Sequence, residues 1–383
     1  METQASTTQV PVAKGIDAAK LERELARMWA EMSAPKGGGQ EAGVVRACVL
    51  NLVVYVAGKE ECPEVNDLLE VVVERHPCRA ILLVADRGAT APRLEAFVST
   101  RCQLTTRGSR QVCGEQITIE ADGPLVDTAS TAVAPLLMPD VPVFLWWKDI
   151  PDRADKLFDR LAEMADRVVI DSASFDRPHK DMLRLAEILK SGRLRASDLN
   201  WGRLTSWRSL VAGFWDVADY RQSLARIERV RIEYDPPERS RDEIAPKALL
   251  ALGWIASCFG WEVSGRGSFV EAGRAHFKLS DGGREVEADL AATDDVAGRD
   301  GWITSLTLTA ASGDEFYVVL RMGEGKLETG ARTGGGQAVG RVLAYEGRSE
   351  GQRLSAELDI LSRDEVYEGA ALFAARMLRA AAA

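Results

Sequence analysis

Cysteine and histidine are the residues from which proteins most often build metal centres, and in this chain they are dispersed. They occur at Cys48, Cys62, Cys78, Cys102, Cys113, Cys258, His76, His179 and His276. Zinc sites usually take their ligands from closely spaced pairs, but this sequence has no CxxC and no HxxxH. It also lacks the GxSxG and GxxxxGK[ST] patterns of nucleophile elbows and phosphate loops. The sequence therefore predicts no metal site, no cofactor and no catalytic residue.

Three acidic residues follow stretches that have the character of buried strands, namely Asp86, Asp149 and Asp171. The carboxyl ends of strands in an open α/β sheet face the usual ligand crevice, so these acids are candidates for a small-molecule or enzymatic site. Acids in such places also cap helices or face water. We favour the capping role, because no catalytic partners can be identified beside them, and keep the crevice as the alternative.

A run of glycines, Gly334 to Gly336, is followed by Gly340 and faintly resembles a dinucleotide-binding loop. Such a loop leads into a helix. Here Gly340 precedes the β-like run RVLAY, so the pattern predicts a hairpin loop instead.

Charge and the apolar pattern narrow the class of protein. The net charge of −10 disfavours binding to nucleic acid or to an anionic membrane. No apolar run reaches the roughly 20 residues of a membrane helix, and METQASTTQVPVAKG lacks the apolar core of a signal peptide. We therefore expect a cytoplasmic protein with reduced cysteines. Cys48, Cys78 and Cys113 lie in or beside apolar strands, which predicts buried, inert thiols, with a redox switch as the alternative.

The 383 residues exceed what one core usually organises, so two domains are expected. Residues 1–40 form an N-terminal helix, capped by Asp17, and a flexible connector. Residues 41–225 form an α/β domain with a mostly parallel, mixed sheet. Its strongest signal is a strand over 44–56, a helix over 64–75 and a strand over 80–85, which predicts a parallel pair. The stretch 111–120 alternates in polarity and is expected at a sheet edge or in antiparallel pairing.

Residues 226–383 have a different pattern, which predicts a smaller α+β domain with an antiparallel sheet. A helix is expected over 246–258, and glycines separate β-like segments such as 301–310, 315–322 and 340–345. A final helix, capped by Ser362 and Glu365, is expected to bury the apolar side chains at Val366, Ala370, Phe373 and Met377.

The segment LLMPDVPVFLWW, residues 136–147, is the most unusual in the chain. Its prolines favour an extended entry into a strand, and adjacent tryptophans on a strand point to opposite faces. One ring can serve the core, and the other requires a helix, a domain or a partner to cover it. We predict that the segment forms or supports a partner-binding surface. Its residues are Pro139, Asp140, Pro142, Phe144, Trp146 and Trp147.

Five segments, in this order and spacing, resemble the signature segments of the OpcA family. They are RACVLNLVVYV (46–56), ERHPCRAILLV (74–84), CGEQITIEADG (113–123), LLMPDVPVFLWW (136–147) and DLNWGRLTSWRSLVAGFWD (198–216). The resemblance implies an assembly or activation factor for glucose-6-phosphate dehydrogenase, the first enzyme of the oxidative pentose phosphate pathway. Such a chain binds the oligomeric dehydrogenase, supports NADPH production and catalyses no reaction itself. The resemblance therefore implies a role in carbohydrate metabolism.

Overall fold

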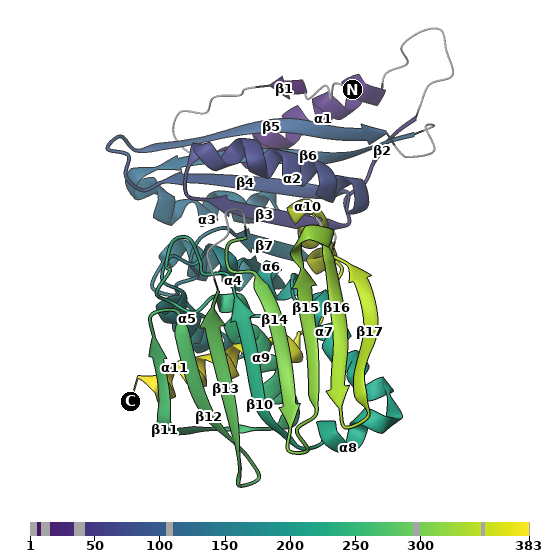
Figure 1. Cartoon of the computed structure of the whole chain (residues 1–383). Coiled ribbons are helices and arrows are strands. Elements are labelled where there is room, and N and C mark those ends of the chain that lie inside the picture. The colour runs from purple at the N-terminus through teal and green to yellow at the C-terminus, as the bar shows by residue number, and fades with distance from the viewer. Residues whose placement is uncertain are drawn as a thin grey trace. The chain divides into compact units, whose positions relative to one another are not determined.

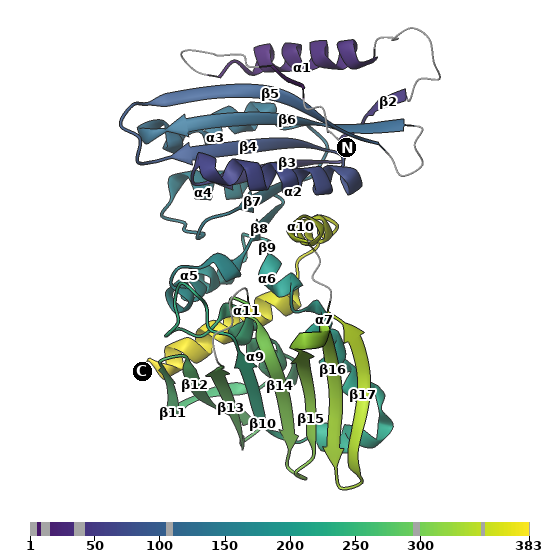
Figure 2. The ribbon, with the colours of Figure 1, turned by 45° about the horizontal axis from the view of Figure 1, so that its top comes forward.

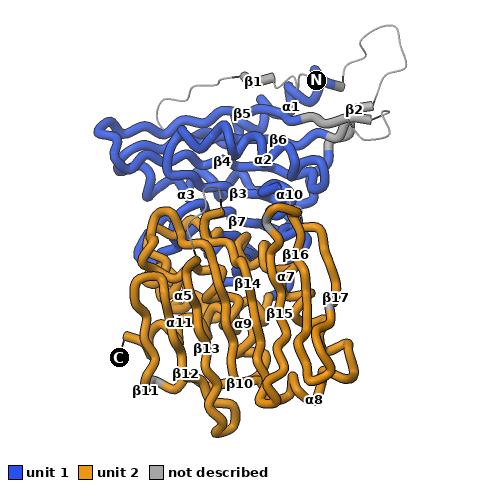
Figure 3. The backbone as a smooth tube through the Cα atoms, in the orientation of Figure 1, with its two compact units in different colours: residues 1–170, 194–197, 349–363 blue, residues 171–193, 198–348, 364–383 orange. Residues whose placement is uncertain are grey.

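The structure is a computed structural model that describes residues 6–8, 16–33, 43–104, 110–293, 299–345 and 349–382. The chain forms two compact units (Figure 3). Unit 1 comprises residues 1–170, 194–197 and 349–363, and unit 2 comprises residues 171–193, 198–348 and 364–383. Each unit therefore draws on more than one stretch of the chain. The domain limits 41–225 and 226–383 stay a prediction, which expression of the two fragments would test.

A nine-stranded mixed sheet organises unit 1 (Figure 1). Its strands are β1 (Ser6–Thr8), β2 (Gly43–Arg46), β3 (Leu50–Val56), β4 (Cys78–Asp86), β5 (Arg93–Leu104), β6 (Arg110–Asp122), β7 (Val143–Trp147), β8 (Arg167–Ile170) and β9 (Ala196–Asp198). The main order is β1-β5-β6-β4-β3-β7-β8-β9, and β2 pairs with β6. The pairs from β6 through β4, β3 and β7 to β8 are parallel, whereas β5 runs antiparallel to β6. The predicted mostly parallel, mixed sheet is confirmed.

One detail of the predicted strands is wrong. The stretch 44–56 is not one strand, because β2 ends at Arg46 and β3 begins at Leu50. The stretch 111–120 pairs antiparallel with β5, which confirms one of the two predicted arrangements, and it lies inside the sheet because β6 also pairs with β4. Its alternating polarity reflects two differently covered faces: Glu115 accepts a hydrogen bond from the indole N–H of Trp29, while Gln116 contacts Asn66.

Helices pack on both faces of this sheet, as Figure 2 shows. The elements are α1 (Ala18–Ser33), η1 (Lys59–Glu61), α2 (Cys62–Arg75), η2 (Gly123–Thr128), α3 (Ser130–Val133), η3 (Ala134–Leu136), α4 (Lys156–Met164) and α10 (Glu350–Leu358). Asp17 caps α1 as predicted, since its carboxylate accepts from the N–H of Lys20 at 3.1 Å. α10 was not predicted, although its capping box of Ser349 and Gln352 is a sequence signal for a helix start. It packs on α2.

Unit 2 contains an eight-stranded sheet with the order β11-β12-β13-β10-β14-β15-β16-β17. The strands are β10 (Ile227–Tyr234), β11 (Glu262–Glu271), β12 (Arg274–Asp281), β13 (Arg284–Ala292), β14 (Ile303–Ala310), β15 (Glu315–Arg321), β16 (Lys326–Thr333) and β17 (Gly336–Ala344). Its pairs are antiparallel except β10 with β13. The predicted antiparallel sheet is confirmed. So is the glycine hairpin, because Thr333 pairs with Gly336 where β16 turns into β17.

The helical elements of unit 2 are η4 (Ser172–Ser174), α5 (Pro178–Lys190), α6 (Leu199–Gly202), α7 (Thr205–Ala212), η5 (Gly213–Asp216), η6 (Ala218–Tyr220), α8 (Arg221–Leu224), α9 (Pro246–Phe259), η7 (Met322–Glu324) and α11 (Glu365–Ala381). The predicted cap of α11 is wrong, since Asp364 caps the helix by accepting from the N–H of Tyr367 at 2.9 Å. Of the side chains predicted to be buried, Val366 is exposed, whereas Ala370, Phe373 and Met377 are buried, as is Tyr367. Among the described residues, no helix has the length and apolarity needed to cross a membrane.

Candidate functional site

The segment between η3 and β7 ends in an exposed tip. Pro139 and Asp140 are exposed, and Asp140 has a backbone φ of 62°, in the left-handed region that few residues other than glycine adopt. Pro142 is half-buried, and its carbonyl oxygen accepts from the N–H of Asn51 at 2.8 Å. The tip is therefore held in one conformation by groups on both of its sides.

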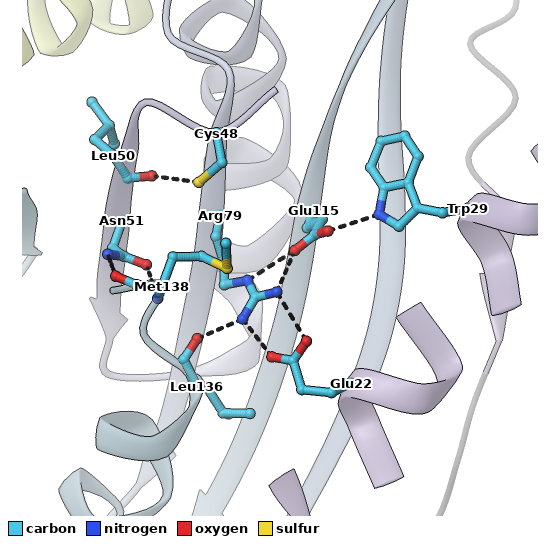
Figure 4. Close-up of polar contacts among 9 residues, drawn as sticks. All are labelled: Glu22, Trp29, Cys48, Leu50, Asn51, Arg79, Glu115, Leu136 and Met138. Carbon is cyan, nitrogen blue, oxygen red and sulfur yellow. Dashed lines mark hydrogen bonds and ion pairs between the residues drawn. The ribbon is translucent and has the colours of Figure 1, made fainter. Parts of the chain in front are cut away.

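Asn51 of β3 clamps the residue that precedes this tip (Figure 4). Its side-chain amide donates to the carbonyl oxygen of Met138 at 3.0 Å and accepts from the N–H of Met138 at 2.8 Å. Asn51 is fully buried, so these bonds satisfy the polar groups of an amide that would otherwise be costly in an apolar strand. The Asn51 side chain therefore makes the two hydrogen bonds to the Met138 backbone that a neighbouring strand would otherwise make.

Arg79 of β4 holds the other end of the same segment. Its guanidinium donates to the carbonyl oxygen of Leu136 at 2.9 Å and to the Glu115 carboxylate at 2.6 and 2.8 Å (Figure 4). It also pairs with Glu22 of α1, and Trp29 of α1 donates to Glu115 at 2.7 Å. Burial lowers the pKa of Arg79, but hydrogen bonding and charge pairing with Glu22 and Glu115 more than offset this, so the net pKa is raised. Arg79 therefore stays charged.

The structure divides the six predicted partner-binding residues into a tip and a base. Phe144, Trp146 and Trp147 are all buried, at 2% exposure or less. Trp147 stacks on Tyr55 with the ring centroids 3.7 Å apart and meets Phe158 edge-on at 5.1 Å. Both tryptophans are covered within the chain, as expected for a central strand with elements on both faces. Pro139 and Asp140 are exposed, and Pro142 is half-buried.

A second possible site lies where the strand order reverses. The order β6-β4-β3-β7-β8-β9 is that of a doubly wound sheet, and its ligand crevice is expected at the carboxyl ends of β3 and β7. Asp86 and Asp149 are exposed there, but each carboxylate accepts from a nearby backbone N–H, of Gly88 and Ile150 respectively. Asp171 belongs to unit 2 and is paired with Arg203 at 2.6 Å. Asp86 and Asp149 therefore belong to unit 1, and the carboxylate of Asp171 is held within unit 2.

The loop after β3, where a doubly wound fold usually binds a pyrophosphate, carries carboxylates. Glu60 folds against Gly58 so closely that a Cβ atom on Gly58 would lie 2.2 Å from its carboxylate. Glu61 accepts from the N–H of Ala57 at 3.3 Å, and Lys148 pairs with Glu61 and Glu64. Negative side chains at a helix N-terminus repel an anion and occupy the donors it would use. These residues do not fit a dinucleotide.

The fifth family-like segment builds a buried polar cluster in unit 2. Asp198 is fully buried, and its carboxylate accepts from the N–H groups of Ser172 at 3.0 Å and Asn200 at 2.9 Å. Trp201 donates to Asp364, the residue that caps α11. The segment therefore fixes the starts of α6 and α11 rather than forming an open site.

This cluster gives a testable pH dependence. Burial, reinforced by the nearby charge of Asp171, raises the pKa of Asp198 from its usual 3.8 to about 6. The folded protein therefore binds more protons between these values, and the contribution of Asp198 to stability is lost as the pH rises towards 6. From pH 5 to pH 7.5 the wild type is expected to lose about 1–2 kcal/mol relative to Asp198→Asn. Urea unfolding at both pH values measures this, with the exposed Asp176→Asn as control. An equal response of wild type and Asp198→Asn would contradict it.

The cysteines differ partly from expectation. Cys113 is disulfide-bonded, and Cys102 lies opposite it in the register of β5 and β6. The prediction of reduced thiols is thus wrong for Cys113, because strand pairing, which spacing does not reveal, decides which cysteines meet. Cys48, Cys62, Cys78 and Cys258 are free. Burial raises the pKa of Cys78 to about 12, as fits an inert thiol. Across the described ranges, no three His, Cys, Asp or Glu side chains cluster as a metal site would require.

The fold of the chain is similar to one known from solved structures. An NAD binding oxidoreductase from Klebsiella pneumoniae matches with a TM-score of 0.50 and 10% identity, over 87% of this chain and 96% of that one. At this identity the likeness establishes the fold alone, and the loop after β3 departs from a dinucleotide site.

Two family models identify the kind of chain more closely. Residues 70–187 match the glucose-6-phosphate dehydrogenase subunit N-terminal domain, and residues 195–371 match the C-terminal domain of the same subunit. The chain belongs to the OpcA family of glucose-6-phosphate dehydrogenase assembly proteins.

Curated relatives agree with this assignment. A protein of Nostoc punctiforme assigned to the OxPP cycle under the name OpcA is 35% identical over 58% of this chain and 47% of its own length. Its namesake in a Synechocystis strain is 28% identical over 80% of this chain and 64% of its own length. The chain therefore spans about half to two thirds of the length of these relatives.

Proposed function

We propose that this chain is a non-catalytic assembly factor and allosteric activator that binds oligomeric glucose-6-phosphate dehydrogenase and so supports NADPH production. One observation carries the proposal beyond the family name. Four family-like segments, which contribute Asn51, Arg79, Glu115 and the stretch 136–147, converge on one buried clamp. The clamp fixes an exposed tip, and a surface held in its bound conformation loses little entropy on docking.

Activation by binding needs only a modest energy. A partner raises activity when it binds the more active conformation or assembly state of the enzyme better than the other. A tenfold gain in substrate affinity corresponds to ~1.4 kcal/mol of coupling. A small part of an interface centred on Pro139 and Asp140 can supply this difference.

The alternative is a small-molecule-binding or enzymatic protein that uses the crevice at the strand ends. The carboxylates of Glu60, Glu61 and Glu64 speak against an anionic ligand there. The purified chain is expected to show no thermal stabilisation and no turnover with glucose 6-phosphate and NADP. Turnover that a single substitution in this chain abolishes would overturn the proposal.

The tip can be tested without disturbing the fold. Asp140→Gly removes the carboxylate and keeps the left-handed backbone, which glycine adopts freely. Combined with Pro139→Ala, it is expected to weaken binding to the dehydrogenase about tenfold while the melting temperature stays within about 2 °C of wild type. Calorimetry and the stimulated dehydrogenase rate measure the first effect, and thermal unfolding the second.

Glu163→Ala is the matched control, because Glu163 is also exposed on unit 1 but lies on α4, outside the tip. It is expected to bind as wild type does. If the tip variant binds the dehydrogenase as wild type does, the partner surface lies elsewhere. The assembly role itself is tested separately, by whether the wild-type chain binds the dehydrogenase.

A further inference from the structure

An open cavity of about 330 Å³ lies within unit 2, whereas the tip and the crevice of the parallel sheet belong to unit 1. Two helical faces form most of its wall. Trp254 and Cys258 are four residues apart on α9, so they share one face, and Ala212 and Trp215 follow each other around the end of α7 and η5. Leu308 of β14, which is fully buried, contributes the wall from the sheet.

Aromatic contacts fix the shape of this cavity. The Phe259 ring stacks on the buried Trp261 with centroids 4.8 Å apart and meets the Trp215 ring at 5.8 Å. Trp215, Trp254 and Phe259 are nevertheless only half-buried, so apolar ring surface faces the opening. Ligand sites are typically preformed, concave and apolar, with volumes from about 300 Å³ upward. The cavity meets the criteria of volume and apolar lining.

The lining also restricts the charge of a ligand. None of the lining side chains that the structure describes is charged, and the polar groups they carry are two indole N–H groups and the thiol of Cys258. A phosphate or carboxylate would be desolvated there, which is unfavourable, and the lining itself offers no charged partner, although the charge of Arg208 acts on Cys258. Sugar phosphates and nucleotides are therefore disfavoured, whereas a flat apolar molecule gains from burial against the rings.

We propose that this cavity is a binding site for a small, uncharged aromatic ligand, separate from the surface that engages the dehydrogenase. A metabolite of this kind would then bind to unit 2, between α7 and α9. The alternative is that an apolar side chain of a partner protein occupies the cavity, and the experiment below distinguishes it from a small ligand.

The test uses the full-length chain and the uncharged fluorescent probe N-phenyl-1-naphthylamine. Wild type is expected to bind it saturably at a single site, with a blue shift and increased emission. Ala212→Phe fills the cavity from an exposed position and is expected to weaken binding about tenfold or more. Ala218→Phe, at an exposed position of η6 outside the lining, is the matched control and is expected to bind as wild type.

The thiol of Cys258 provides a second readout, since it is exposed and lines the cavity. Its alkylation by N-ethylmaleimide, followed by peptide mass spectrometry, is expected to slow severalfold when the probe is bound, while Cys62 reacts at an unchanged rate. Equal probe binding by Ala212→Phe and wild type, or no saturable binding at all, would overturn the proposal. So would loss of dehydrogenase stimulation by Ala212→Phe without probe binding by wild type, because the cavity is then a partner contact.

Discussion

Replacing Arg79 with alanine is expected to lower the free energy of unfolding by about 3–5 kcal/mol, because it leaves the Glu115 carboxylate charged and buried without its partner. For a cooperatively unfolding unit of about 150–250 residues, the size range of unit 1, such a loss corresponds to a fall in melting temperature of roughly 6–20 °C. The stimulation of the dehydrogenase is expected to fall as well, since Leu136 loses the donor that anchors the start of the tip segment. Urea unfolding and a coupled dehydrogenase assay measure the two effects.

Two further variants separate the buried charge from the loss of packing. The double variant Arg79→Met with Glu115→Gln carries no unpaired buried charge. It is therefore expected to recover part of the unfolding free energy that Arg79→Ala loses. Arg75→Ala, from the same segment of the chain, breaks only an exposed pair with Asp359 and is expected to cost no more than about 1 kcal/mol. If Arg79→Ala proved as mild as Arg75→Ala, the clamp would not be a source of stability.

Trp147→Ala is expected to destabilise the protein by a similar amount, about 3–5 kcal/mol, because a fully buried ring is replaced by a cavity between Tyr55 and Phe158. Trp147→Phe keeps an aromatic ring and is expected to cost much less. The indole nitrogen of Trp147 has no hydrogen-bond partner among the described residues, so phenylalanine sacrifices no such bond. Denaturant unfolding of both variants checks the order.

The variant Trp147→Phe also shows whether the Trp147 ring contacts the partner or only supports the tip. If Trp147→Phe folds stably and still stimulates the dehydrogenase, the ring supports the tip from the core. If Trp147→Phe kept its stability and lost stimulation, the ring itself would contact the partner, contrary to its burial. Phe269→Ala, which removes an exposed ring from β11, serves as the control and is expected to leave stability nearly unchanged.

Periodicity predicted the elements of this fold where one face or both are buried over many residues. The apolar strand 80–85 and the helix 64–75 are examples, and both are observed as β4 and α2. The break between β2 and β3 was missed because Ala47 to Val49 are compatible with an extended strand by composition alone. The neighbours of β6 depend on long-range pairing, which local alternation does not report.

The tip segment was found from its unusual prolines and tryptophans, but the clamp beneath it was not. Asn51 and Arg79 lie far apart in sequence from Leu136 and Met138, and only the folded sheet brings them together. A signal existed all the same: a single amide within the apolar run VLNLVVYV and an arginine at the start of CRAILLV are polar groups that a buried strand must satisfy. Their partners, however, require tertiary structure.

The return of α10 to unit 1 has a consequence for biosynthesis. Gly351 of this helix lies against Val71 of α2, where a Cβ atom would come within 2.8 Å, and His76 at the end of α2 contacts the carbonyl oxygen of Ser355. At translation rates of about 5–20 residues per second, the nascent chain waits roughly 10–40 s between residue 170 and residue 363. During that interval α2 has no α10 to cover it, so the side chains that α10 later buries are expected to stay exposed on the ribosome-bound chain.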